Sequence, residues 1–233
     1  GSINFESSEV RFVLDKDNNP IDVYFKDVLQ TNYLIEEFML LTNKTVAKHI
    51  QPLKNKTTPF IYRVHDLPDS DKIKSLSGVV KKFGHLVDNK NPKTLSKSLN
   101  LLLKNVKGSV EQDMVEKLTV RSMSKAIYTI NNIGHYGLGF NYYTHFTSPI
   151  RRYPDLIVHR ILEKILYNNK SLNKKELEKI CKHCSEMERI ASQAERDSIK
   201  YMQVQFLKDR VGEVYEGVVS GVTDWGLYVE IIS

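Results

Sequence analysis

One long stretch of this chain, residues 173–208, limits the possible folds more than any other part of the sequence. Apolar and small side chains recur in it at steps of three and four residues, which places them along one side of an α-helix. This stripe consists of Leu177, Cys181, Cys184, Met187, Ala191, Ala194, Ser198 and Tyr201. We therefore predict a single helix over 173–208, much longer than the average of about three turns. The core that packs against it must come from elements elsewhere in the chain.

The rest of the sequence mixes strand and helix patterns without a repeating strand–helix unit. Apolar or alternating runs at 10–14 and 21–25 flank a turn rich in Asp and Asn, which indicates a β-hairpin, and residues 60–64 are typical of a short strand. Periodicity predicts further helices over 31–50, 70–83 (capped by Ser70), 96–106, 110–128 and 154–167. The first of these has on one side Leu34, Ile35, Phe38, Leu41, Thr45, Val46 and Ile50. The mixture favours an α+β fold.

The last part of the chain changes in character. From Gly212 onward, valines and other apolar residues form two short strand patterns around a turn that contains Trp225. This pattern is typical of a small barrel of the OB type, which has five strands. We expect only its first strands here, and place a domain boundary between 3–210 and 211–233.

Positive charge is concentrated in one segment. The chain has a net charge of +6, whereas residues 72–107 alone hold nine Lys and one Asp, a net +8. A local basic surface has nucleic acid as its commonest partner. A solvated lysine face on ordinary surface helices explains the same pattern equally well.

Several protein classes are excluded. A hydrophobic content of 41% with 9% aromatic residues is too high for a wholly disordered chain. No apolar run approaches the roughly 18–20 residues of a membrane span, so we expect no membrane partner. The only cysteines are Cys181 and Cys184, which excludes a disulfide framework and favours a reducing compartment such as the cytoplasm. Without a second ligand pair, we interpret them as small apolar residues of a helix rather than a zinc site.

The densest chemical signal is the segment 135–153. Six of the 18 residues from 136 to 153 are aromatic, Tyr143 among them, and an arginine pair, Arg151-Arg152, follows Thr147 and Ser148. Rings that stack on bases, next to guanidinium groups that bind phosphate, are suited to single-stranded nucleic acid. The two hydroxyls precede a predicted helix start, which also favours an anion. The alternative is a loop packed under the domain, with Ser148 as a cap and the arginines in salt bridges.

Acidic residues give two further candidates. Glu36-Glu37 lies on the predicted helix 31–50, and Glu195 lies on the long helix among small neighbours that allow close approach to its carboxylate. A surface glutamate is the simpler interpretation of each. Asp66, Asp69 and Asp71 have the oxygen ligands that Mg²⁺ prefers, but acids at a helix N-terminus complement the helix dipole and explain the cluster better.

Four segments of this sequence resemble the ribonuclease R/ribonuclease II (RNB) family of exoribonucleases. Residues 135–160 read HYGLGFNYYTHFTSPIRRYPDLIVHR, which is similar to a long and specific family signature, and 34–39 read LIEEFM. Residues 194–197 read AERD, and 212–230 resemble the first strands of an S1 RNA-binding domain. The Arg-Arg-Tyr-Pro sequence at 151–154 is closer to the ribonuclease R branch. The resemblance implies that 3–210 is the C-terminal part of an RNB catalytic domain and 211–233 an incomplete S1 domain.

This family comprises processive, Mg²⁺-dependent 3′→5′ exoribonucleases that hydrolyse single-stranded RNA to nucleoside 5′-monophosphates. By resemblance, Arg151 would hold the 3′-terminal phosphate and stabilise charge in the transition state, while Glu195 and Glu36 would position the last nucleotide. The residues expected to contact RNA are Phe5, Tyr143, Thr147, Ser148, Arg152, Trp225 and Tyr228. We expect a monomeric cytoplasmic enzyme.

One part of the family pattern is missing. Nothing in the chain matches the aspartate cluster that holds the family's metal ion, and we expect that Gly1-Ser2 is not the natural start of the protein. We therefore expect the chain to begin after the metal site, to hold no metal and to be inactive alone. The alternative, from a different class, is a non-catalytic RNA-binding or scaffold protein with the same fold.

Overall fold

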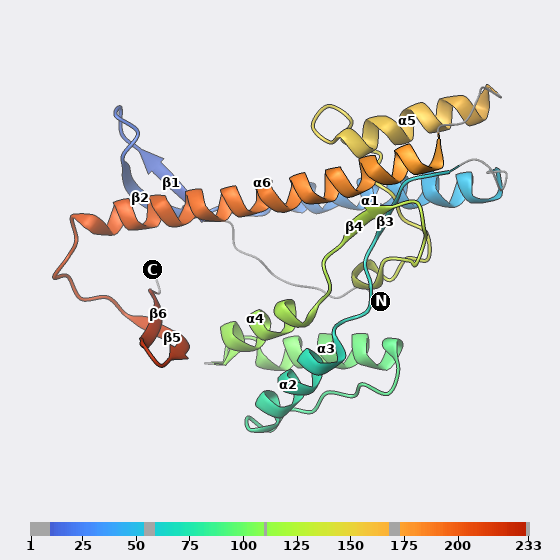
Figure 1. Ribbon diagram of the computed structural model, residues 1–233. Helices are drawn as coiled ribbons and strands as arrows, with labels where there is room; N and C mark the ends of the chain where they lie inside the picture. The colour runs from blue at the N-terminus through green and yellow to red at the C-terminus, as the bar shows by residue number, and fades with distance from the viewer. Residues whose placement is uncertain (1–9, 54–58, 110, 168–172, 232–233) are drawn as a thin grey trace.

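The structure, a computed structural model, describes residues 10–53, 59–109, 111–167 and 173–231. Figure 1 shows the long helix α6 crossing the molecule, with α1 behind it, α5 above it and three shorter helices below. In chain order the elements are β1 (Val10–Leu14), β2 (Pro20–Phe25), α1 (Gln30–Leu53), β3 (Tyr62–Val64), α2 (Ser70–Lys81), α3 (Pro92–Val106), α4 (Gln112–Ser122), β4 (Ile127–Thr129), the 3₁₀-helix η1 (Tyr136–Leu138), α5 (Tyr153–Leu166), α6 (Lys174–Lys208), β5 (Gly217–Thr223) and β6 (Gly226–Ile231).

The strands of the described ranges form three separate antiparallel pairs. Two of these, β1–β2 and β5–β6, are hairpins between neighbouring strands, as the sequence predicts. The third joins β3 to β4 across the α2–α3–α4 segment, with Tyr62 opposite Thr129 and Val64 opposite Ile127. Small sheets among many helices confirm the α+β class.

Two hydrophobic cores lie apart from each other in the fold. The first is formed by the C-terminal half of α1, β3, β4, α5 and the start of α6, and includes Ile50, Phe60, Tyr62, Val158, Ile161, Leu177 and Cys181. The second lies within α2, α3 and α4 and includes Ile73, Leu76, Val80, Leu99, Leu102, Val106 and Val115. The three helices α2–α4 are thus a packed unit of their own (Figure 1).

Among the described residues of the long helix, only those near its beginning are fully buried. Leu177 and Cys181 are buried, whereas Met187 is 42% exposed and Tyr201 62%. In the same way, Leu34 and Phe38 near the start of α1 are exposed, although the periodicity predicts that they share a face with Ile50, which is buried. The apolar stripes are therefore longer than the surfaces that the described residues offer to cover them.

Cys181 is a buried free thiol, and burial raises its pKa to about 12. Cys184 is a second free thiol at the edge of the same core. Both therefore act as small apolar residues, as predicted.

Two local predictions are wrong. The helix predicted over 110–128 ends at Ser122, because residues 127–129 pair with β3 and the preceding Ser124 hydroxyl donates to the Leu67 carbonyl. Such long-range pairing overrides helical periodicity. The cap of α2 is Asp69 rather than Ser70, since the Asp69 carboxylate accepts from the amides of Asp71 and Lys72.

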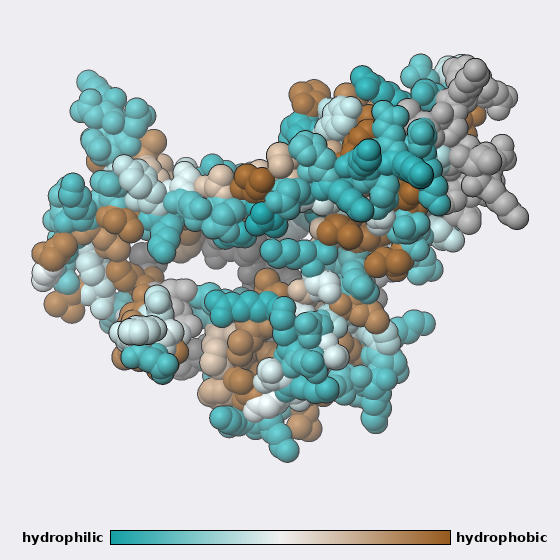
Figure 2. Space-filling view, in the orientation of Figure 1, coloured by the Kyte–Doolittle hydropathy of each residue, from teal (hydrophilic) through white to brown (hydrophobic). Residues whose placement is uncertain are grey.

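The surface shows where charged and apolar groups gather. All nine lysines of residues 72–107 are exposed on or beside the α2–α3–α4 unit. Figure 2 shows brown, hydrophobic surface around the C-terminal end of α6, where Val211 and Val214 are almost fully exposed. Among the helices of the described ranges, none combines the length and apolarity needed to cross a bilayer.

Candidate functional site

The segment predicted to carry the chemistry is irregular, and backbone bonds fix it against β3. The Arg63 amide donates to the Tyr143 carbonyl at 3.0 Å, and the Thr144 hydroxyl donates to the Ile61 carbonyl at 2.8 Å. Further along, the Tyr136 amide donates to the His65 carbonyl at 2.9 Å. The segment therefore follows the free edge of β3, which satisfies backbone groups that would otherwise be buried unpaired.

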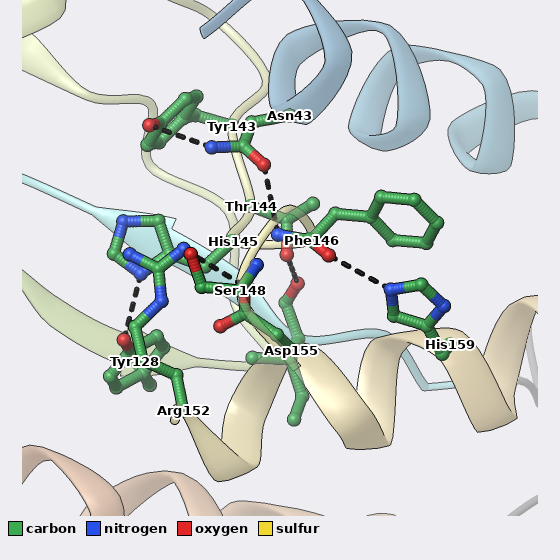
Figure 3. Close-up of polar contacts among 11 residues, drawn as sticks. Asn43, Tyr128, Tyr143, Thr144, His145, Phe146, Ser148, Arg152, Asp155 and His159 are labelled. Carbon is green, nitrogen blue, oxygen red and sulfur yellow. Dashed lines mark hydrogen bonds and ion pairs between the residues drawn. The ribbon is translucent and has the colours of Figure 1, made fainter. Parts of the chain in front are cut away.

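A buried asparagine ties this segment to α1. The Asn43 side chain is 3% exposed, donates to the Tyr143 hydroxyl at 3.2 Å and accepts from the Phe146 amide at 2.9 Å. Phe146 is in turn stacked on His159 of α5, whose ring nitrogen lies 2.8 Å from the Phe146 carbonyl oxygen. Figure 3 shows that these contacts hold the segment between α1 and α5.

A cavity of about 280 Å³ lies at this junction. Its walls combine apolar groups of α1 with polar groups from two elements, and its lining residues are Asn32, Ile35, Glu36, Met39, Leu40, Asn43, Tyr143 and Arg152. Three predicted site residues, Glu36, Tyr143 and Arg152, thus face one space although they are far apart in the sequence. A carboxylate, a guanidinium group and amides around a small apolar surface are suited to one polar ligand.

The two arginines have different surroundings. Arg151 is exposed, whereas Arg152 is partly buried and its Nη2 donates to Asp155 Oδ1 at 2.8 Å. Asp155 lies in the first turn of α5 and is fully buried, and the same oxygen accepts from the Ser148 amide at 2.9 Å. The predicted salt bridge for an arginine is therefore present, but Ser148 caps no helix, because α5 begins only at Tyr153.

The Ser148 amide is held by Asp155, and Thr147 lies one position earlier. Thr147 and Ser148 both precede α5, which begins at Tyr153. Their amides therefore do not form the N-terminus of this helix. Sequence reasoning gave Asp155 no role. The signal for such a role in the sequence is the spacing of three positions between Arg152 and Asp155, which is typical of an ion pair.

A layer of rings lies behind the cavity. His65 stacks on His135 at 5.2 Å between centroids, and Tyr143 lies edge-on to His135 at 5.3 Å and to His145 at 5.7 Å. The Tyr128 hydroxyl is 2.8 Å from Nδ1 of His145. These contacts use much of the aromatic surface that the sequence offers for base stacking.

Burial controls the charge of these rings. Burial, reinforced by the positive charge of Arg152, lowers the pKa of His145 to about 2, and burial with neighbouring His65 lowers the pKa of His135 to about 4. Burial also raises the pKa of Tyr143. The histidines are therefore neutral near pH 7, and the positive charge beside the cavity comes from the arginines.

A second, larger cavity of about 610 Å³ lies between β4 and α6, and the sequence did not predict it. Its lining contains positive and negative side chains and includes Arg63, Lys125, Glu178, Glu186, Glu188, Arg189 and Arg196. Arg63 makes a two-fold contact with Glu188, at 2.6 and 3.0 Å, and its guanidinium carbon lies 4.6 Å from the centre of the Tyr128 ring. These pairs join α6 to the ring layer.

Other predicted residues lie apart from the small cavity. Glu195 is exposed on α6, as are its neighbours Ala191, Ala194 and Ser198. Trp225 and Tyr228 are exposed by 96% and 62% on the β5–β6 hairpin. Phe5 lies outside the described residues.

The acidic cluster near α2 does not fit a metal ion. Asp69 is the helix cap, and Asp71 pairs with Lys74 at 3.0 Å. Across the described part of the chain, no group of three or more His, Cys, Asp or Glu side chains is placed to hold a metal.

Comparison with known families identifies the family of this chain. The model of the RNB domain matches residues 1–168, which include α1, the irregular segment and α5. The chain therefore belongs to the RNB domain family.

Its relatives within that family include ribonuclease R enzymes. Ribonuclease R of Aquifex aeolicus is 37% identical over 99% of this chain and 33% of its own length, so the chain spans about a third of this relative. The solved structure of Mycoplasma genitalium RNase R with ribose-methylated single-stranded RNA superimposes on 99% of the chain and 37% of its own, with a TM-score of 0.88 and 30% identity. Yeast Ssd1, described as a pseudonuclease, matches 68% of the chain and 20% of its own, with a TM-score of 0.58 and 27% identity.

Proposed function

We propose that this chain is the C-terminal part of the RNB catalytic domain of a processive 3′→5′ exoribonuclease, which hydrolyses single-stranded RNA to nucleoside 5′-monophosphates. The carrying observation is the small cavity, where Glu36 and Arg152 face one space next to the turn that presents Arg151. The Mycoplasma genitalium relative, solved with single-stranded RNA, supports the choice of substrate.

Each site residue has a role that suits its position. Arg151 is exposed, so its guanidinium group is available to the 3′-terminal phosphate and to charge that develops there. Glu36 and Glu195 would position the last nucleotide from α1 and α6. Tyr143 is 4% exposed, so it would contribute to the cavity wall rather than offer a stacking face.

The remaining RNA contacts are proposed on separate parts of the chain. Arg152 would contact RNA inside the cavity, and Thr147 and Ser148 would contact it at the turn that precedes Arg152. Trp225 and Tyr228 would provide stacking surfaces on the β5–β6 hairpin, which we assign to the beginning of an S1 domain. We also propose Phe5 as a ring that stacks near the RNA end.

We further propose that hydrolysis needs Mg²⁺ held by carboxylates in the length of the relatives that this chain does not span. The described residues hold no fitting cluster, so the 233-residue chain should be inactive alone. The parent protein is proposed to be monomeric. Two free cysteines, one of them buried, agree with the reducing environment of the cytoplasm.

The test compares the full-length protein with the 233-residue chain on a 5′-labelled single-stranded RNA. We expect the full-length protein to release mononucleotides with Mg²⁺, to shorten the RNA from its 3′ end and to stop when the metal is chelated. The chain alone should release none. Robust turnover by the chain alone would show that it contains a complete metal site.

A non-catalytic RNA-binding or scaffold protein is the second candidate, because the pseudonuclease Ssd1 shares this fold. The same assay separates the two candidates. RNA binding by the full-length protein without release of nucleotides at any Mg²⁺ concentration would favour the non-catalytic role.

A further inference from the structure

Asp155 is a fully buried carboxylate that contacts both ends of one short turn. Its Oδ1 accepts from the Ser148 amide at the start of the turn and from the Arg152 guanidinium group at its end. Within the turn, the Ser148 carbonyl accepts from the amides of Arg151 and Arg152 at 3.3 and 3.0 Å. Figure 3 shows Ser148, Arg152 and Asp155 gathered at the start of α5.

This arrangement is a poor source of stability. Burying a carboxylate and a guanidinium group costs desolvation energy, and well-packed apolar residues often replace such a pair without loss. The cost is not fully offset here, because Asp155 Oδ2 and Arg152 Nε are buried without a hydrogen-bond partner among the described residues. What the pair does provide is a fixed geometry for the turn.

Two consequences follow for the arginines. The contact with Asp155 uses one edge of the Arg152 guanidinium group and leaves the residue facing the cavity that also contains Glu36. The closed turn fixes the backbone from which the Arg151 side chain extends. A single carboxylate is thus bonded both to the turn that precedes Arg151 and to the guanidinium group of Arg152.

We infer that Asp155 is the positioning residue for Arg151 and Arg152, an inference that rests on the proposed function of Arg151 at the RNA 3′ end. Asp155 touches no substrate and acts through the turn. When it is replaced, RNA should still bind, because exposed cations elsewhere supply most of the affinity. The chemical step should slow, because misplacing a group by about 1 Å can cost on the order of 100-fold.

The experiment uses the full-length protein and Asp155→Asn, which keeps the shape of the side chain and removes its charge. Glu186→Gln is the matched control, because Glu186 also pairs with an arginine three positions away, Arg189, at 2.7 Å but on an exposed face of α6. For each variant, kcat and KM are measured on single-stranded RNA. RNA-binding stoichiometry reports the folded fraction, and hydrogen exchange over 144–152 reports the turn.

We expect Asp155→Asn to lower kcat by about 10-fold to 100-fold while KM and stoichiometry change less than about threefold. Exchange over 144–152 should accelerate, and Glu186→Gln should behave like the wild type. In an Arg151→Ala background, under single-turnover conditions, Asp155→Asn should lower the rate by a clearly smaller factor than in the wild-type background, because only Arg152 is left for it to position.

If the losses in rate of Asp155→Asn and Arg151→Ala simply multiply in the double variant, Asp155 is a general structural residue and the inference is overturned. An unchanged kcat for Asp155→Asn would overturn it as well. If Asp155→Asn does not fold, Asp155→Glu, which retains the charge but shifts the carboxylate, is measured instead in the same double-mutant cycle with Arg151→Ala. If Arg151→Ala alone keeps wild-type turnover, the proposed function of Arg151 fails instead. The exchange of 144–152 still shows in that case whether Asp155 holds the turn.

Discussion

At the scale of single residues, Arg151 and Arg152 are neighbours with different environments. Arg152 is held by Asp155 and lines the cavity, whereas Arg151 is exposed. We expect Arg151→Ala in the full-length protein to lower turnover by about 100-fold to 1,000-fold, the usual loss when one group that stabilises transition-state charge is removed. RNA affinity should change far less. Comparable losses in kcat and affinity would make Arg151 a binding residue only.

The control for this prediction is Arg160→Ala, which removes an exposed arginine from α5. It should leave kcat close to that of the wild type. A loss as large as that of Arg151→Ala would show that the assay responds to the charge of α5 in general.

The sequence could identify candidate residues for the chemistry but not how each is held. The aromatic and Arg-Arg pattern of 135–153 singles out Tyr143, Arg151 and Arg152. Nothing local in that pattern indicates that Tyr143 is buried and bonded to Asn43, a hundred positions earlier. The difference between the arginines likewise depends on the burial of Asp155, which is a property of the packed core.

At the scale of elements, Asn43 is the connection between α1 and the irregular segment. Asn43→Ala removes the partner of the Phe146 amide and of the Tyr143 hydroxyl, and leaves one partly buried and one buried group unpaired. We expect a loss of about 2–4 kcal/mol in the free energy of unfolding, measured by urea titration. Thr45→Ala, at an exposed position of the same helix, should cost less than about 1 kcal/mol. Equal losses would mean that Asn43 is not a tether.

The α2–α3–α4 unit is the element that carries the positive charge. Its lysines are exposed and its core is separate, which is compatible with RNA contact and with a solvated face alike. If they contact RNA, replacing Lys93, Lys97 and Lys104 with Gln should flatten the dependence of log affinity on log salt by about 0.7 for each of the three that pairs with a phosphate. Replacing the same three with Arg is the charge-preserving control. An unchanged slope would identify a solvated face.

Local patterns predicted those elements whose structure is local. The hairpins β1–β2 and β5–β6 and the helix α6 all follow from short-range periodicity and turn residues. In contrast, β4 was predicted to be helical, because its partner β3 is separated from it by three helices. Long-range pairing is what a periodicity argument cannot see.

At the scale of the whole molecule, much apolar surface remains open. The first turns of α1, the β1–β2 hairpin and the second half of α6 expose, among others, Leu34, Phe38, Tyr24, Phe25, Ile190 and Val204. Such extensive exposure of large apolar side chains on adjoining elements is unusual for a folded protein. The apolar stripe of α6 predicts one long helix correctly. Most of the stripe is nevertheless exposed, so the stripe does not predict which residues of the helix are buried.

Acid stability is the property of the whole fold that follows from its buried histidines. Burial lowers the pKa of His145 to about 2 and that of His135 to about 4, whereas both titrate near 6.5 in the unfolded chain. Well above pH 6.5 both histidines are neutral in the folded and the unfolded state, so their protonation does not affect stability there. Below it the unfolded chain takes up protons that the folded state excludes, so the free energy of unfolding should fall by about 2 kcal/mol per histidine between pH 7 and pH 5.

Urea titrations of the 233-residue chain at pH 7, 6, 5.5 and 5 measure this decline in a range where most carboxylates are still ionised. The double variant His135→Gln/His145→Gln is less stable at pH 7 but should lose most of the decline, because it has neither buried imidazole to protonate. His183→Gln, on the exposed side of α6, retains both buried histidines and should follow the wild type. A decline in the double variant as steep as in the wild type would place the acid sensitivity elsewhere in the fold.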